Sequence, residues 1–307
     1  MALEPNVINI RGDVFVRFTR QGLPWQAQKL SVMKSEPMSA AGPRPIITLL
    51  TDFGTADVHV GIMRAVIFSI CPEANVVDLT HQVPPQDIAR AAFLLETAWR
   101  QFPVHSIHVG VIDPEVGSAR RGIALDAGGH YFVGPDNGLF SYVTEEAGAK
   151  AVALTRPWYF LGKVSHTFHA RDVFAPVAAH LARGIAFSSV GDAVPLSELQ
   201  RLPVSRPSIQ AQEIEAHVIH VDRFGNLITD LKKSELAAWL GKGIKAHIQA
   251  GPAEIKRLSR FYAEVEPGQP LALISSSDRV EISVNLGSAS QQLGLGPGSV
   301  IRITKSE

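Results

Sequence analysis

The chain has 307 residues, enough for two domains or for one large domain. Hydrophobic residues make up 46% and charged residues 19%, a composition that is typical of a well-buried core and excludes intrinsic disorder. Lysine plus arginine and aspartate plus glutamate balance at 29 each, so the basic excess of nucleic-acid-binding proteins is missing, and we expect no nucleic-acid partner. No apolar run reaches the roughly 20 residues of a membrane-spanning helix, and we expect no membrane contact.

Cys71 is the only cysteine, so no disulfide can form within the chain. This indicates a reducing compartment, and we expect a cytoplasmic protein. Residues 1–45 show no secretory pattern, and residues 34–45 have the composition of a linker. We therefore expect a poorly ordered N-terminal extension over residues 1–45, a folded part that begins near Pro45, and Met38 as an alternative first residue.

Strand and helix patterns alternate from residue 45 onward. Apolar runs halted by polar residues predict strands, and apolar residues at helical spacing predict helices. Strands are expected at 45–51, 75–81, 106–112 and in 130–140, and helices at 62–70, 86–101 and 171–185. This order predicts an α/β domain over residues 46–196 with a mainly parallel sheet.

The pattern changes after a predicted linker over residues 197–211. Short apolar segments follow, separated by glycine, proline and serine turns. They lie near 215–221, 226–231, 245–249, 279–285 and 299–304. Short strands at this spacing predict a small barrel or sandwich over residues 212–307.

Three predicted strands of the α/β domain end on Asp52, His81 and Asp113. Ligands of open α/β sheets bind outside the carboxyl ends of the strands, so we expect these residues at one rim. If residues 106–113 and 120–125 form adjacent antiparallel strands, Asp113 also lies opposite Arg120, and the two side chains form a charge-assisted pair. A purely structural ion pair at the base of a hairpin explains the same spacing.

Two histidines, His166 and His169, precede the last predicted helix. A structural loop histidine is one interpretation, and a metal site with Asp172 is another, because His-x-x-His-x-x-Asp brings three possible ligands together. No HExxH motif or cysteine cluster completes a coordination shell, so we expect no metal.

Asp57 and Asn226 each have two interpretations. Asp57 either caps the first helix or binds a polar ligand. The segment 221–231 predicts a turn with Gly225 at positive φ, in which Asn226 is either a turn former or an amide that faces a ligand. The glycines near Asp52 match neither the dinucleotide-binding nor the P-loop pattern.

Seven segments taken together resemble the S-adenosylmethionine (SAM) hydroxide adenosyltransferase family, the water-using relatives of the fluorinase and chlorinase. In chain order they are TLLTDFG, VVDLTH, GVIDPEVGSARRGIAL, GPDNGLF, TFHARDVFAP, DRFGNLITDL and ISVNLGSAS. The resemblance covers about residues 46–305. It implies a Rossmann-like N-terminal domain, a C-terminal β-barrel, and a homotrimer whose sites lie between the N-domain of one subunit and the C-domain of its neighbour.

The family reaction converts SAM and water to adenosine and methionine, and the resemblance implies that no cofactor or metal takes part. It implies a catalytic triad of Asp113, Arg120 and His169. The implied substrate-binding residues are Asp52 at the ribose, Asp57 and Asp222 at the amino-acid end, Asn226 at the adenosine, Ser276 at the methionine portion, the backbone of Val284 and Asn285 at the adenine, and also Phe168 and His81.

The halide-binding positions of the fluorinase hold His169 and Ala170 here, and its site tyrosine is replaced by Asp113. These groups suit a water nucleophile and do not cradle a halide. Relatives usually have glycine where Ala170 and Glu115 stand, and both changes are expected to lower the rate. A halogenase of the same fold, an adenosine- or SAM-binding module with little catalysis, and a metal-dependent hydrolase are the alternatives.

Overall fold

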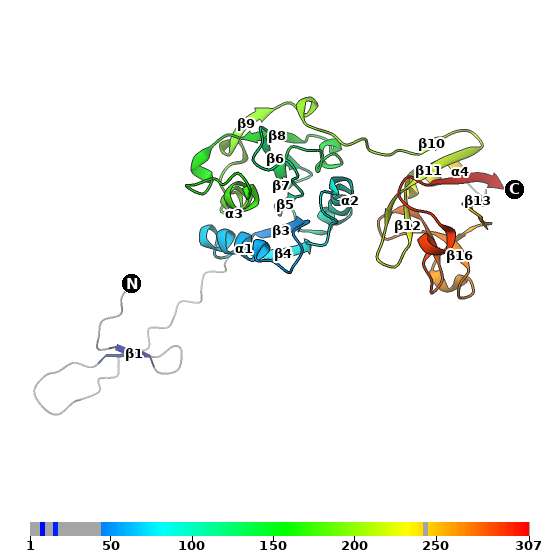
Figure 1. The fold of residues 1–307 in the computed structure, drawn as a ribbon, viewed down its shortest axis with the longest axis horizontal. Helices are drawn as coiled ribbons and strands as arrows, with labels where there is room; N and C mark the ends of the chain where they lie inside the picture. The colour runs from blue at the N-terminus through cyan, green and yellow to red at the C-terminus, as the bar shows by residue number, and fades with distance from the viewer. Residues whose placement is uncertain (1–6, 10–14, 18–43, 242–244, 307) are drawn as a thin grey trace, which may run out of the picture. The chain divides into compact units, whose positions relative to one another are not determined.

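A computed structural model describes residues 7–9, 15–17, 44–241 and 245–306. The chain divides into two compact units, residues 1–44 and 45–307. In the first unit, β1 (Val7–Asn9) pairs antiparallel with β2 (Phe15–Arg17) (Figure 1). The rest of the N-terminal extension, including Met38, lies outside the described residues. No helix in the described ranges is both long and apolar enough to cross a membrane.

The second unit begins with a seven-stranded sheet in the order β4-β3-β5-β7-β6-β8-β9, which we call the α/β part together with its helices (Figure 1). Its strands are β3 (Ile46–Thr51), β4 (Asn75–Thr80), β5 (Ile107–Val111), β6 (Gly122–Ala127), β7 (His130–Pro135), β8 (Lys150–Leu154) and β9 (Gly191–Val194). The pairings among β4, β3, β5 and β7 are parallel, and those among β7, β6, β8 and β9 are antiparallel. The sheet is therefore mixed, and the prediction of a mainly parallel sheet was wrong for its second half.

The strands on either side of the Asp113 loop are not neighbours, which corrects the expected hairpin. β7 lies between β5 and β6. The turn that joins β6 to β7 has Gly128 at φ 59° and Gly129 at φ 80°, the glycine-dependent geometry of a tight hairpin. Because this turn pairs β6 with β7, β7 takes the place beside β5, and the loop from β5 to β6 must pass the end of β7.

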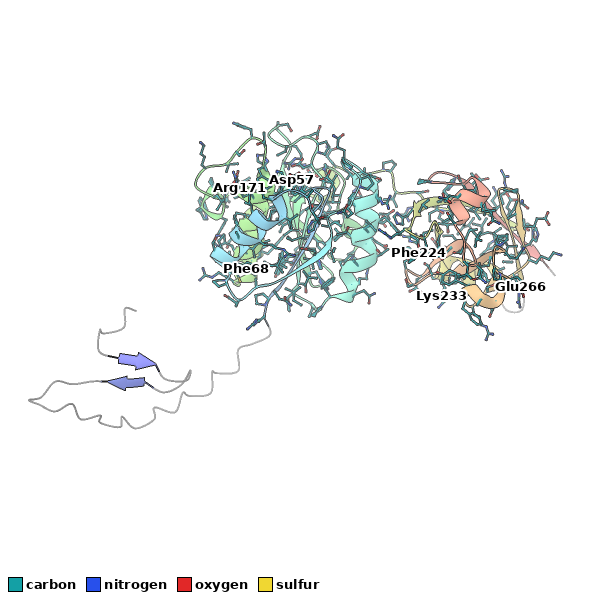
Figure 2. The ribbon with its side chains drawn as sticks, turned by 60° about the horizontal axis from the view of Figure 1, so that its bottom comes forward. Asp57, Phe68, Arg171, Phe224, Lys233 and Glu266 are labelled. Carbon is teal, nitrogen blue, oxygen red and sulfur yellow. The ribbon has the colours of Figure 1, made fainter. Side chains whose placement is uncertain are left out.

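Helices α1 (His59–Ile70), α2 (Ile88–Ala98) and α3 (Ala175–Ala182) belong to this part. Asp87 caps α2 by accepting a hydrogen bond from the Arg90 backbone N–H at 2.9 Å. Asp57 is exposed just before α1 (Figure 2), but Val58 holds the N-cap position and no side chain caps it. The capping interpretation of Asp57 was therefore wrong.

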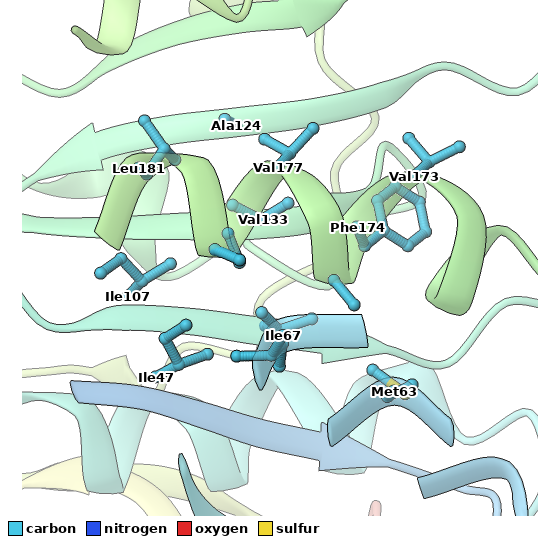
Figure 3. Packing of buried hydrophobic residues seen from close by; sticks show 14 of the residues in the cluster. Ile47, Met63, Ile67, Ile107, Ala124, Val133, Val173, Phe174, Val177 and Leu181 are labelled. Carbon is cyan, nitrogen blue, oxygen red and sulfur yellow. The ribbon is translucent and has the colours of Figure 1, made fainter. Parts of the chain in front are cut away.

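Apolar side chains fill both faces of the α/β sheet. On one face, Ile47, Met63, Ile67 and Phe174 belong to a core that α1 and α3 cover (Figure 3). On the other face, the core contains alternate strand residues such as Leu125 together with the buried side of α2. Two covered faces leave the strand ends as the natural place for a polar site.

A second sheet, which we call the barrel part, is nearly closed and has the order β14-β13-β18-β11-β12-β17-β16-β15, with β10 paired to β11. Its strands are β10 (Ser208–Ile209), β11 (Glu213–Val221), β12 (Leu227–Lys232), β13 (Lys245–Ala250), β14 (Ala253–Ile255), β15 (Leu258–Ser259), β16 (Pro270–Ile274), β17 (Arg279–Val284) and β18 (Val300–Ser306), with helices α4 (Lys233–Leu240) and α5 (Ala289–Leu293). Each of the five predicted strands matches one of these strands, whereas β10, β14, β15, β16 and both helices were not predicted.

A buried histidine pair ties three strands of the α/β sheet together. His108 is fully buried, its Nδ1 lies 2.8 Å from Thr48 Oγ1, and its Nε2 lies 3.2 Å from His130 Nδ1. Burial, reinforced by His130, lowers the pKa of His108 to about 3. Burial also lowers the pKa of His130. Both rings are therefore neutral at physiological pH.

We expect the free energy of unfolding to fall as the pH drops from 7 to 5. The unfolded chain protonates His108 near pH 6.5, whereas the folded chain does so only near its lowered pKa, so the unfolded state binds more protons between these values. The slope is at most about 1.4 kcal/mol per pH unit for this group. Urea unfolding of His108→Gln should show a flatter dependence, while His247→Gln, a partly exposed control, keeps the original slope. Equal slopes in all three proteins would contradict this assignment.

Candidate active site

Asp113 and Arg120 come together with His169, which lies 49 residues beyond Arg120 in the sequence. Arg120 Nη2 donates to Asp113 Oδ2 at 2.6 Å and lies 3.2 Å from His169 Nδ1. The side chains of Arg120 and Asp113 are only 3% and 5% exposed. One guanidinium thus joins a buried carboxylate to the imidazole of the half-buried His169.

The three side chains are brought together by two loops, the loop after β5 and the segment that leads to His169. The loop after β5 folds on itself, with the Val116 N–H donating to the Asp113 carbonyl at 3.3 Å. Gly117 has φ 84°, and a Cβ there would lie 2.1 Å from the His166 carbonyl oxygen. The absence of a side chain at Gly117 lets this loop pack against the segment that leads to His169. His169 immediately precedes a π-helical turn, Ala170–Phe174, a feature that is common at functional sites.

Burial is the largest cause of the pKa shifts of Asp113, Arg120 and His169. It raises the pKa of Asp113 despite the opposing effect of Arg120 and His169. It also lowers the pKa of His169, and the nearby Arg120 lowers it further. His169 is therefore neutral at physiological pH. Because Arg120 can only donate, His169 Nδ1 is the acceptor, and the ring carries its proton on Nε2.

Two buried polar atoms of this cluster are unused. Among the described residues, Asp113 Oδ1 and Arg120 Nε have no hydrogen-bond partner. An unpaired polar atom in a buried site costs free energy unless a ligand or water satisfies it. Asp113 Oδ1 and Arg120 Nε are therefore the atoms of the cluster that keep unused hydrogen-bonding capacity.

The structure also shows where the other predicted residues of the α/β part lie. Asp52 Oδ2 accepts the backbone N–H of Gln86 at 2.9 Å. His81 is buried, with Nδ1 2.8 Å from Thr51 Oγ1 and Nε2 3.1 Å from Asp78 Oδ1. Through these contacts His81 links the end of β3 to Asp78 of β4. Its contact with the substrate stays a prediction.

Phe168 belongs to an aromatic cluster that sequence patterns did not reveal. Its ring centroid lies 5.1 Å from that of His59 and 6.0 Å from that of Phe53. The only sequence signal for the cluster was the presence of aromatic residues beside Asp52 and His169.

The metal interpretation of His166, His169 and Asp172 finds no support in the geometry. Asp172 accepts hydrogen bonds from Arg171 and from the Ser165 backbone N–H, so its carboxylate is occupied. No group of three or more histidine, cysteine, aspartate or glutamate side chains in the described part of the chain could hold a metal ion.

The barrel part carries a cavity of about 540 Å³. Asn226, Val284 and Asn285, three of the residues that the family resemblance implies at the substrate, lie together in its lining. Their contact with a substrate stays a prediction. Phe224, 76% exposed, and Leu286, 89% exposed, also line the cavity and had not been predicted. The remaining lining residues are Tyr262, Gly287 and Ser288.

Asp222 and Ser276 do not line this cavity. Asp222 accepts hydrogen bonds from Asn226, which does line the cavity, with 2.9 Å between Asp222 Oδ2 and Asn226 Nδ2. Ser276 lies in the turn before β17, whereas Val284 ends that strand, so the two are separated by the length of β17. Ser276 lines a different cavity, together with Lys232.

The α/β part thus carries a buried cluster of Asp113, Arg120 and His169, and the barrel part carries a cavity of about 540 Å³. Residues 47–191 match the SAM hydroxide adenosyltransferase N-terminal domain, and residues 216–302 match the C-terminal domain of the same family. The chain belongs to the SAM hydroxide adenosyltransferase family.

Individual relatives agree with this assignment. The chain is 40% identical to an (R)-S-adenosyl-L-methionine hydrolase of Salinispora tropica, over 85% of this chain and 98% of the relative. A fluorinase of Nocardia brasiliensis is more distant, with 25% identity over 85% of this chain and 97% of the relative. The crystal structure of an uncharacterized conserved protein from Thermotoga maritima superposes with a TM-score of 0.78 and 33% identity, over 84% of this chain and 99% of that chain.

We expect Gly117→Ala to separate the two loops, because the new Cβ collides with the His166 carbonyl oxygen. Gly148→Ala is the matched control, since Gly148 also has positive φ, 76°, but has open space around it. Gly117→Ala should lower the free energy of unfolding by more than the control does. It should also raise the pKa of His169 toward its ordinary value, as followed by NMR titration. Equal effects of the two substitutions would refute this account.

Proposed function

We propose that the protein hydrolyses SAM to adenosine and L-methionine by in-line attack of water at C5′. The observation that carries this proposal is the buried Asp113–Arg120–His169 cluster with its unused carboxylate oxygen. Membership of the SAM hydroxide adenosyltransferase family supports it.

In the proposed reaction a water oxygen bonds to C5′ while the bond from C5′ to sulfur breaks. The electron pair of that bond goes to sulfur, so methionine leaves as a neutral thioether and needs no acid. One water proton must be removed, and Asp113 Oδ1 is the acceptor that the geometry leaves free. His169 donates through Nε2 to orient the water, and Arg120 positions both partners. Such positioning can supply several kcal/mol of barrier lowering.

The sulfonium carries its own activation, so we propose that no metal or cofactor takes part. Asp52 binds the ribose through the carboxylate oxygen that Gln86 leaves free, and Phe168 and His81 complete the α/β side of the site. Asn226 and the backbone of Val284 and Asn285 bind the adenine in the cavity of the barrel part. Asp57, Asp222 and Ser276 are proposed for the methionine portion.

The two groups of residues lie on different sheets, and the family resemblance implies a site completed by two subunits. We propose a cytoplasmic homotrimer in which the Rossmann-like domain of one subunit meets the barrel domain of its neighbour.

A halogenase is the second candidate, because fluorinases are among the relatives. Against it, Asp113 places a negative charge where a halide would attack, and the hydrolase of Salinispora tropica is the more similar relative. A halogenase would form 5′-chloro-5′-deoxyadenosine at high chloride. A pure binding module would hold the ligand without releasing methionine.

We expect the purified protein to convert SAM to equal amounts of adenosine and methionine. In ¹⁸O-labelled water the label should enter adenosine at C5′, because the nucleophile is solvent. Chromatography with mass detection measures both. Label-free adenosine, or activity that chelators abolish, would contradict the proposal.

Asp113→Asn should reduce turnover by about 10²- to 10⁴-fold, because the amide cannot accept the proton, while adenosine still binds. Asp192→Asn, which neutralises an exposed aspartate of the same part, is the control and should keep full activity. In the unchanged protein, turnover should fall as the pH decreases through the pKa of Asp113, and burial places that limb above the value of an ordinary aspartate. Undiminished turnover of Asp113→Asn would exclude the carboxylate as the base.

A further inference from the structure

We propose that Gln86 is a positioning residue, whose strained backbone keeps its N–H directed at the Asp52 carboxylate and so holds this carboxylate ready for the ribose. The inference rests on the proposed function, in which Asp52 binds the ribose of the substrate. Gln86 itself is exposed, and it acts through its backbone alone.

The turn over residues 84–87 has type II geometry. The Asp87 N–H donates to the Pro84 carbonyl at 3.1 Å, which closes the four-residue turn. Pro85 holds the second position, where its ring fixes φ near about −65°, and Gln86 holds the third position with φ 68°. A type II turn requires positive φ at the third position and favours glycine there. Glutamine in this place therefore carries backbone strain.

The strained conformation determines where the Gln86 N–H points. Type I and type II turns differ by a rotation of roughly 180° of the central peptide group, which here joins Pro85 to Gln86. In the observed turn the N–H of this group donates to Asp52 Oδ2 at 2.9 Å. A type I turn would instead direct the Pro85 carbonyl oxygen, an acceptor, toward the carboxylate. Positive φ at Gln86 is thus the condition for its contact with Asp52.

The other peptide group of Gln86 is held as well. Its carbonyl accepts the Ile88 N–H at 2.9 Å, across Asp87 with φ −81° and ψ 77°, which is an inverse γ-turn. Asp87 also caps α2 through the Arg90 N–H. The turn is therefore attached to the first turn of α2, and the Gln86 N–H keeps its direction.

The backbone on either side of Asp52 is tied to the segment that leads into this turn. The Gly54 N–H donates to the His81 carbonyl at 2.8 Å, and Thr51 Oγ1 lies 2.8 Å from His81 Nδ1. His81 thus holds the chain, while Gln86 holds the carboxylate. No residue in the described ranges donates to Asp52 Oδ1, so this oxygen can accept a ribose hydroxyl.

A carboxylate that is already oriented binds a hydroxyl more tightly than one that must first be ordered, because the cost of fixing the side chain has been met in folding. A hydrogen bond to a charged acceptor corresponds to about a tenfold or larger gain in affinity. Loss of the Gln86 N–H should therefore appear as a loss of ribose recognition. Contacts made elsewhere on the nucleoside should keep their strength.

The test measures dissociation constants of the full-length protein for adenosine and 2′,3′-dideoxyadenosine by calorimetry. The unchanged protein should bind adenosine at least about tenfold more tightly, and Asp52→Ala should abolish this preference. Gln86→Val should bring the ratio of the two constants close to one, because a β-branched residue disfavours positive φ and converts the turn to type I. Gln86→Gly adopts positive φ freely and should keep the ratio of the unchanged protein.

His105→Val is the matched control. His105 has the same φ, 68°, but it precedes β5 at the amino ends of the parallel strands, whereas Asp52 follows β3 at the carboxyl ends. Both valine variants should lower the melting temperature by similar amounts, and only Gln86→Val should lose the preference for adenosine. If Gln86→Val does not fold, Gln86→Pro, which has no N–H to donate, decides the question.

A folded Gln86→Val or Gln86→Pro protein that keeps the full preference for adenosine would overturn this inference and leave the proposed function standing. Full preference in Asp52→Ala would overturn the proposed ribose contact of Asp52 and this inference with it. An unchanged protein that binds neither nucleoside would overturn the proposed function itself.

Discussion

The Arg120 guanidinium is the group on which the organisation of the candidate active site depends. Its Nη2 contacts both Asp113 and His169, which come from loops about fifty residues apart in the sequence. Removing two charges from water is expensive, and a buried pair seldom repays that cost in stability alone. Asp113 also keeps one oxygen unsatisfied among the described residues, which adds to the cost. This cost in stability is accounted for by the role that we propose for the pair in the reaction.

The strand order determines where this pair can form. Because β7 lies between β5 and β6, the loop that carries Asp113 and Arg120 has to cross the end of β7. The backbone N–H of Asp136, just after β7, donates to the Arg121 carbonyl at 2.9 Å and fixes the end of this crossing. The loop is thus held at the carboxyl ends of the parallel strands, where both covered faces of the sheet leave room for polar groups.

Sequence patterns predicted the strand, helix, strand alternation of the α/β part, because buried strands and amphipathic helices leave clear periodicities. They placed Asp113 beside Arg120 correctly but for the wrong reason, since the hairpin they assumed does not exist. They missed the mixed character of the sheet because strand order depends on long-range pairing. They also missed Phe224 and Leu286, since exposed apolar residues in turns follow no period and become informative only when a cavity brings them together.

Aspartate residues with similar sequence surroundings perform different tasks here, and the difference lies in their unused hydrogen-bonding capacity. Asp222 accepts three hydrogen bonds from its own loop, and both of its oxygens are engaged. Asp113 receives Arg120 on one oxygen and keeps the other free inside a buried site. A carboxylate whose acceptors are engaged can orient neighbours but is poorly placed to take up a proton, whereas one with a free, desolvated oxygen can act as a base. Both residues follow strands, so the sequence could not separate these roles. The hydrogen-bond partners of each oxygen do.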